Sequence, residues 1–166
     1  MTLTVRPTTS ADLALVDALL ARSYPVLLKP DYPPSVLVTA LPLISRARPE
    51  LLTCGTYYLV ESAAGQVLGA GGWTRATPTG GSLRQGVAHI RHVVTDPAHT
   101  RKGVGRALMT RIVEAAQADG IHLLDCLSTR TAVPFYGAMG FEMRAETDIP
   151  LRPGITFPAI HMQRGI

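Results

Sequence analysis

The sequence predicts an α/β (α+β) fold: a single domain over residues 1–166, with a mixed central sheet of about six to seven strands flanked by about four helices. Three observations predict this class. Strand and helix patterns alternate along the chain, and no repeat or low-complexity linker interrupts them. Residues 57–73 have the pattern of an antiparallel hairpin, and residues 88–128 have that of a strand, a helix and a strand. The 166 residues, 46% of them hydrophobic, are enough to bury one core.

The N-terminal segment predicts a strand followed by a helix. Residues 3–7 are a short β-rich run closed by proline. Thr9 and, three residues later, Asp12 have the pattern of a capping box, which marks a helix start before regularly spaced apolar residues. We therefore expect a helix from about residue 10 to Ala21 or beyond.

The middle of the chain predicts a second helix, a hairpin and a strand. Apolar residues are dense from Ser35 onward, but Pro42 should kink or end this helix because proline lacks a backbone N–H. Residues 57–73 form two apolar runs around a polar turn, as in a hairpin. Residues 74–86 are polar and rich in glycine, which indicates a loop, and residues 88–95 then predict a strand.

The second half of the chain predicts a βαβ unit. A long helix places Met109, Ile112 or Val113, and Ala116 along one face, and Gly120 follows it as a C-terminal cap. The strands on either side of such a helix are parallel, with a right-handed crossover. The remaining predicted elements are a strand over residues 121–128, a short helix over residues 132–140 and two strands between residues 141 and 162.

Composition and charge exclude several classes of protein. The net charge of +4 does not come from a basic stripe, because basic residues are scattered singly outside the cluster Arg101, Lys102, Arg106 and Arg111. We therefore expect no nucleic-acid partner. No apolar run approaches the ~18 residues of a membrane span, and the N-terminus has no apolar signal core, so we expect no membrane partner and a cytoplasmic protein. Cys54 and Cys126 are far apart in sequence, which predicts small buried residues and neither a disulfide nor a metal site.

Two glycines lie among basic side chains in the stretch DPAHTRKGVGRALM, residues 96–109, where the long helix begins. The first N–H groups of a helix have no partner within it and the helix dipole is positive there, so the position favours an anion. Gly103 and Gly105 remove the Cβ atoms that would keep a phosphate at a distance. We predict a phosphate or pyrophosphate ligand; the alternative is a turn of ordinary packing value with solvated basic residues.

Two familiar phosphate-binding motifs do not fit this stretch. Walker A requires a lysine after its glycines, whereas Lys102 precedes both glycines here. A dinucleotide-binding fingerprint requires a third small residue, and that position is Leu108. Neither motif explains the turn.

The stretch resembles the acyl-CoA loop of the GNAT-type N-acetyltransferase superfamily, whose pattern is Gln or Arg, two residues, Gly, any residue, then Gly or Ala. Gly103 and Gly105 fit this pattern, and Thr100 stands where the family usually has Gln or Arg. The resemblance continues on both sides, because VVTDP resembles the central strand of the family and TAVPFYGAMGF, residues 131–141, resembles its last helix motif.

This resemblance implies acetyl-CoA as the cosubstrate and no metal. Main-chain groups of Val93, Val94 and Thr95 would pair with the pantetheine arm, in a gap where the two central parallel strands splay apart. Backbone N–H groups of the loop would bind the pyrophosphate; the loop residues are Arg101, Lys102, Gly103, Val104, Gly105 and Arg106.

The resemblance also implies direct acetyl transfer to an amine within a ternary complex. Tyr136 matches the tyrosine of the family that donates a proton to the sulfur of CoA, and its alternative is a helix tyrosine packed in the core. A phenol with a pKa near ~10 stays protonated at neutral pH. We expect the main-chain N–H of Val94 to meet the developing oxyanion.

The sequence leaves the general base open. Many members of the family have a glutamate on the central strand, where this chain has His89, Arg91 and His92. His89 is one candidate and Asp125 on the returning strand is a second; the alternative for each is an ordinary polar or partnered residue. A covalent route through Cys126 is not expected, because this residue lies in an apolar strand without a neighbouring base.

The acceptor is predicted by class, as a primary amine of a small molecule or a peptide. The segments where this family binds its acceptor are poor in acids here, which argues against a polycation. We expect Arg75 and Arg84 in the loop over residues 74–86 to meet an anionic part of the acceptor. Dimers are common in such families, so a homodimer is one expectation. The alternative function is a non-catalytic acyl-CoA-binding sensor or partner subunit, although a sensor would not require Tyr136.

Overall fold

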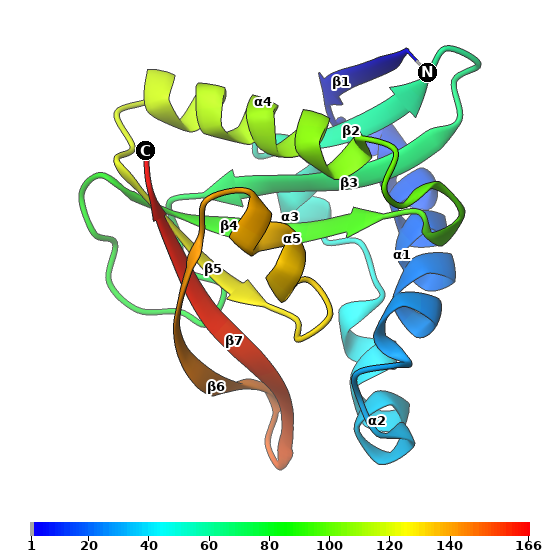
Figure 1. Ribbon diagram of the computed structural model, residues 1–166, viewed down its shortest axis with the longest axis vertical. Helices are drawn as coiled ribbons and strands as arrows, with labels where there is room; N and C mark the ends of the chain where they lie inside the picture. The colour runs from blue at the N-terminus through cyan, green and yellow to red at the C-terminus, as the bar shows by residue number, and fades with distance from the viewer. Residues whose placement is uncertain (1) are drawn as a thin grey trace.

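The computed structural model describes residues 2–166, which are arranged around one seven-stranded sheet (Figure 1). The strands are β1 (Leu3–Pro7), β2 (Tyr57–Ser62), β3 (Val67–Thr74), β4 (Val87–Thr95), β5 (Leu123–Ser128), β6 (Glu142–Arg152) and β7 (Ile155–Gly165). Their order in the sheet is β1-β2-β3-β4-β5-β7-β6. β4 and β5 are parallel and every other neighbouring pair is antiparallel, which confirms the predicted mixed sheet.

Five α-helices flank this sheet, one more than the sequence predicts. They are α1 (Leu13–Leu28), α2 (Pro34–Ile44), α3 (Pro49–Leu52), α4 (Val104–Ala118) and α5 (Val133–Ala138), and 3₁₀ turns precede α1 (Ser10–Asp12) and α4 (Pro97–His99). The additional helix, α3, has four residues, so it is too short to show a helical period in the sequence. No helix within residues 2–166 combines the length and the apolar character that a membrane span requires.

The first two helices begin close to their predicted starts and end later than predicted, whereas α5 ends at Ala138, two residues before the predicted Gly140. Thr9 forms the predicted capping box with Asp12, although this box starts a 3₁₀ turn that leads into α1. α1 continues through Pro25 to Leu28, beyond Ala21. Pro42 does not stop α2 at once, because the helix ends two residues later at Ile44, and within that last turn the missing N–H costs one hydrogen bond.

The two faces of the sheet carry different helices. α4 and α5 pack on one face, where Met109, Ile112 and Ala116 of α4 are buried as predicted. α1 and α3 pack on the other face, around Leu19, Leu52 and neighbouring side chains. α2 contacts β7 through a smaller apolar cluster that includes Leu37 and Phe157. Gly120, with φ of 81°, follows α4 as the expected C-terminal cap and turns the chain into β5.

β4 and β5 separate after a short paired segment. They pair only from Val87 to His89, against Leu123 to Asp125, and beyond this point β4 stays with β3 while β5 stays with β7. A bulge in β4 lies three residues further on, where His92 and Val93 fill the space opposite one residue of β3. Bulges bend a strand and increase its twist. The splayed parallel strands that the resemblance implies are therefore present.

Candidate active site

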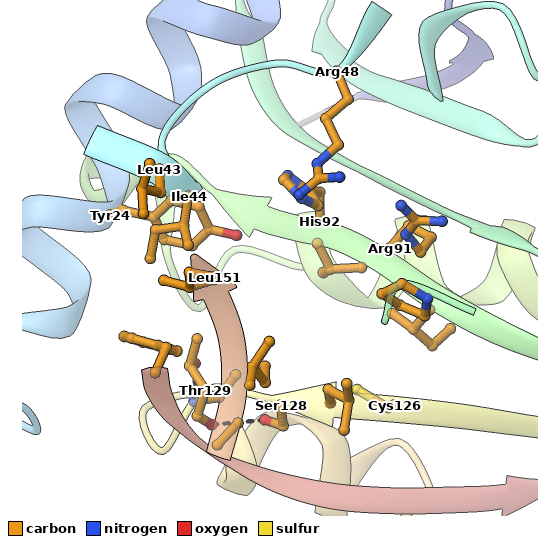
Figure 2. A pocket seen from close by; sticks show the side chains of 18 of the residues that line it. Tyr24, Leu43, Ile44, Arg48, Arg91, His92, Cys126, Ser128, Thr129 and Leu151 are labelled. Atoms are coloured by element: carbon orange, nitrogen blue, oxygen red, sulfur yellow. Dashed lines mark hydrogen bonds between the residues drawn. The ribbon is translucent and has the colours of Figure 1, made fainter. Parts of the chain in front are cut away.

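A cavity of about 280 Å³ occupies the gap between β4 and β5 (Figure 2). Its walls come from these two strands, α5, the hairpin of β6 and β7, Tyr24 of α1 and the C-terminal end of α2. The hairpin and α2 contribute mainly apolar side chains such as Ile44, Leu151 and Phe157. The polar groups that face the cavity therefore stand out as the candidates for chemistry or specificity.

Tyr136 reaches this cavity from α5. Its ring is 4% exposed and packs edge-on against Phe135 and Phe141, with centroids 5.2 Å away in each case. Burial raises the pKa of its phenol well above the ordinary value, and the neighbouring Cys126 thiol adds to this. The side chain is thus held in one orientation as a protonated O–H, the form that a proton donor needs.

Cys126 lines the same cavity but has the properties of a packing residue. It is 2% exposed, and burial raises the pKa of its thiol to about 12, even though a hydrogen bond with Tyr136 acts in the opposite direction. A thiol with this pKa is almost fully protonated at neutral pH, so it is a poor nucleophile.

The other cysteine, Cys54, was predicted to be buried but is exposed, because it lies in the tight turn between α3 and β2.

The start of α4 has free backbone donors. Gly103 is its N-cap in the left-handed conformation, with φ of 83°, and no side chain caps the helix. The space beside Gly103 is open, since a Cβ placed there would have no atom within 4 Å. Three exposed cationic side chains surround this point: Arg101, Lys102 and Arg106. Uncapped N–H groups beside open space and positive charge favour an anion, so this geometry is compatible with the predicted phosphate site.

Gly105 also has a packing role that the sequence did not indicate. A Cβ at this position would lie 2.7 Å from Cε1 of Phe135, so glycine permits the close approach of α4 to α5. The sequence prediction assigned both glycines to phosphate binding. The contact between Gly105 and the ring of Phe135 joins residues 30 positions apart, so no short sequence pattern could indicate it. This contact joins the anion site directly to the helix that carries Tyr136.

The pairing of β4 with β3 shows which of its predicted CoA-binding residues have a free backbone N–H. The N–H of Asp96 donates to the carbonyl of Leu68 in β3, at 2.8 Å. Backbone groups alternate sides along a strand, so Val94 also faces β3 and Thr95 does not, while Val93 lies in the bulge, where it is not paired one-to-one with β3. Val93 lines the cavity and Val94 does not. The geometry therefore favours Val93 over Val94 as an N–H donor in the gap.

His89 and Asp125 lie together, but outside the cavity lining. His89 Nδ1 is 3.5 Å from Asp125 Oδ2, and the other oxygen of Asp125 lies 2.6 Å from His161 Nε2 and accepts from Gln163 Nε2 at 2.9 Å. Burial favours the neutral acid, but the hydrogen bonds from His89, His161 and Gln163 outweigh it and hold the pKa of Asp125 well below its usual range. Asp125 is therefore a weak base and a strong partner for the two imidazoles.

Sequence reasoning missed two residues of this network. His161 and Gln163 alternate with buried Ile160 and Met162 along β7, so strand periodicity could have placed them on one face. Only the pairing of β5 with β7 brings them to Asp125. Within residues 2–166, no group of three or more His, Cys, Asp or Glu side chains is arranged to hold a metal ion.

The loop arginines do not take the predicted role. Nη2 of Arg75 lies 2.7 Å from Oδ2 of Asp119 at the end of α4, and neither Arg75 nor Arg84 lines the cavity. The loop contributes Pro78 instead. The cations at the cavity are Arg48, which the sequence did not indicate, and Arg91; both lie beside His92.

His92 occupies the β4 bulge in a left-handed conformation, with φ of 45°. Burial lowers its pKa to about 4, and the positive charges of Arg48 and Arg91 contribute to this. The imidazole is therefore neutral at physiological pH. The charges of Arg48 and Arg91, which lie beside this imidazole, make this end of the cavity positive.

Residues 54–143, more than half of the chain, match the family model described as an acetyltransferase (GNAT) domain. A segment of 55 residues is 34% identical to glucosamine 6-phosphate N-acetyltransferase from Trypanosoma brucei brucei, and it spans 33% of this chain and 37% of that protein. The chain thus matches little more than a third of that relative.

Solved structures with similar folds extend over the whole chain. A GCN5-related N-acetyltransferase from Rhodopseudomonas palustris has a TM-score of 0.80 at 18% identity, covering 100% of this chain and 97% of its own. The PaiA N-acetyltransferase from Thermoplasma acidophilum, solved in complex with coenzyme A, has a TM-score of 0.74 at 15% identity, with full coverage of both chains. At these identities the likeness establishes the fold.

Proposed function

Because this chain belongs to the GNAT acetyltransferase family, we propose that it transfers an acetyl group from acetyl-CoA to a primary amine of a small molecule or peptide, directly within a ternary complex. One observation carries the proposal. The uncapped start of α4 touches α5 through Gly105 and Phe135, and α5 places the buried Tyr136 hydroxyl in the gap between the splayed strands. The proposed anion site at the start of α4 is therefore in direct contact with the helix that carries the proposed proton donor.

The residues along this path fit coenzyme A. Its phosphates suit the free N–H groups from Arg101 to Arg106, and its amide-bearing arm suits the unpaired edge of β4 at Val93 and Thr95. Acetyl-CoA supplies an activated thioester, so no group of the protein needs to become acylated. The high pKa of the Cys126 thiol supports direct transfer over a covalent route.

The reaction needs a proton for the sulfur, a donor for the oxyanion and a base for the amine, and each of these is assigned to a group beside the cavity or the adjoining network. We assign the proton of the departing sulfur to Tyr136 and the stabilisation of the oxyanion to the N–H of Val93. The proton of the amine is assigned to His89, through water, with Asp125 orienting the imidazole. Asp125 itself is disfavoured as the base because its pKa is low.

Thiol release from acetyl-CoA over a panel of primary amines tests this function. Tyr136→Phe should lower kcat by about 10²- to 10⁴-fold, the range expected for loss of a general acid, while the affinity for acetyl-CoA is retained. Tyr58→Phe is the matched control, because Tyr58 is an equally buried tyrosine that does not line the cavity. Binding of acetyl-CoA without release on any amine would favour the non-catalytic sensor instead.

A further inference from the structure

Two arginines lie at one end of the cavity without acidic partners. Arg91 projects from β4, and Arg48 reaches toward His92 from the segment before α3 (Figure 2). Within residues 2–166, no aspartate or glutamate lines the cavity, and neither arginine is within 4.0 Å of a carboxylate. Glu50 raises the pKa of Arg91 by its charge, but no carboxylate of the described residues forms an ion pair with either arginine.

The burial of Arg91 makes this arrangement costly unless a ligand compensates it. Arg91 is 8% exposed; its Nη1 donates to Thr74 Oγ1 at 3.0 Å, and its Nε has no partner among the described residues. Burial and the charge of Arg48 both lower the pKa of Arg91. A buried cation with a free donor is unfavourable alone, whereas an anion in the cavity would satisfy both its charge and its hydrogen bond.

This charge lies on the opposite side of the sheet from the start of α4. Ile90 packs in the core beneath α4, and the next residue, Arg91, points to the other face, toward α3 and Tyr57. The coenzyme phosphates belong to the α4 face in the function proposed above. An anion at Arg48 and Arg91 therefore belongs to the acceptor.

We propose that Arg48 and Arg91 form a subsite for a carboxylate or phosphate group carried by the amine acceptor. This inference rests on the proposed acetyl transfer and names the substrate class: a small primary amine with an anionic group. The cavity volume of about 280 Å³ is near the lower end for ligand pockets, which suits a small molecule. The apolar wall formed by Ile44, Leu151 and Phe157 suits its uncharged part.

Matched pairs of acceptors test the subsite. One pair is an amino acid and its amide, and the other is an amino alcohol and its phosphate monoester, so that each pair differs in the anionic group. The anionic member should have the higher kcat/KM, and Arg91→Met should raise its KM by about 10- to 100-fold while leaving the neutral member nearly unchanged. The larger preference of the two pairs distinguishes carboxylate from phosphate.

Two further variants keep the test interpretable. Arg48→Met should have the same selective effect, and it is suited to this test because Arg48 is exposed and makes no ion pair that folding needs. Arg75→Met is the matched control, since Arg75 is an exposed arginine that pairs with Asp119 outside the cavity. Equal kcat/KM for both members of each pair, in the wild type and in both cavity variants, would overturn the subsite and leave acetyl transfer intact.

A binding measurement separates the subsite from the activity. Inorganic phosphate and acetate are titrated into the full chain while the ring signals of His92 are followed by NMR, because this imidazole lies beside both arginines. Saturable shifts that disappear in Arg91→Met and in Arg48→Met support the subsite even if no amine is acetylated. Absence of saturable shifts in the wild type would count against it whatever the activity.

Discussion

The contact between Gly105 and Phe135 makes the strongest quantitative prediction, for the variant Gly105→Ala. The added Cβ would lie 2.7 Å from Cε1 and 3.1 Å from Cζ of the ring, where carbon atoms normally stay about 3.5–4.0 Å apart. The ring also packs against Tyr136, with centroids 5.2 Å apart, so it cannot move freely. The start of α4 must therefore shift away from α5.

We expect this overlap to cost about 1–3 kcal/mol, as for other overpacked sites, or roughly 2–12 °C in Tm for a domain of this size. The affinity for acetyl-CoA should fall as well, because the shifted residues carry the anion site. Thermal unfolding and calorimetric titration with acetyl-CoA measure the two effects on the same samples.

A second substitution identifies the cause of the effect. Phe135→Leu removes the ring atoms that the new Cβ meets, so it should restore much of the stability and affinity in the double variant. Gly103→Ala is the comparison, because its Cβ would touch nothing and its cost comes from a φ of 83° alone. If Gly105→Ala matches the wild type in both measurements, or if Phe135→Leu fails to rescue it, the packing explanation is wrong.

Two further predictions concern the titrating groups. The pKa of Asp125 is lower in the folded chain than in the unfolded one, so the carboxylate stabilises the fold above pH ~4 and this contribution disappears as pH falls through the folded pKa. Asp125→Asn should therefore lower the free energy of unfolding in urea most at pH 7 and by a smaller amount at pH 3, which lies between the unfolded and the folded pKa of Asp125; an equal loss at both values would contradict the assignment. A thiol reagent at pH 8 should label Cys54 rapidly and Cys126 only after unfolding, because one is exposed and the pKa of the other is about 12. Fast labelling of Cys126 in the folded Cys54→Ser variant would argue against its burial.

Local patterns were sufficient to predict most of the fold. The capping box at Thr9, the hairpin around its polar turn, and the apolar face of α4 each depend on residues within a few positions of one another, and all three are confirmed. The extra helix α3 escaped prediction because a single turn has no period. Cys54 was placed wrongly because composition alone does not indicate which short segments become exposed turns.

The acceptor side was harder to predict because it depends on contacts between distant segments. Arg48 precedes α3 and Arg91 lies on β4, and nothing in the sequence near either residue indicates that they meet. Arg75 and Arg84 have the more suggestive setting in a glycine-rich loop, yet Asp119 holds Arg75 at the end of α4. The sequence around an arginine does not indicate what its side chain contacts. Only the folded structure shows that Arg48 and Arg91 line the cavity while Arg75 and Arg84 do not.

The bulge in β4 links the cosubstrate side to the acceptor side. Side chains two residues apart on a regular strand share a face, so without the bulge Arg91 and Val93 would point in the same direction. The extra residue, His92, places Val93 beneath α4 while Arg91 remains on the face of α3. The bulge follows His89, the last residue of β4 that pairs with β5, and both bulge residues line the cavity. One inserted residue thus places the side chains of Arg91 and Val93 on opposite faces of the sheet, so that in the proposed function an acceptor held by Arg91 approaches from the face opposite the start of α4.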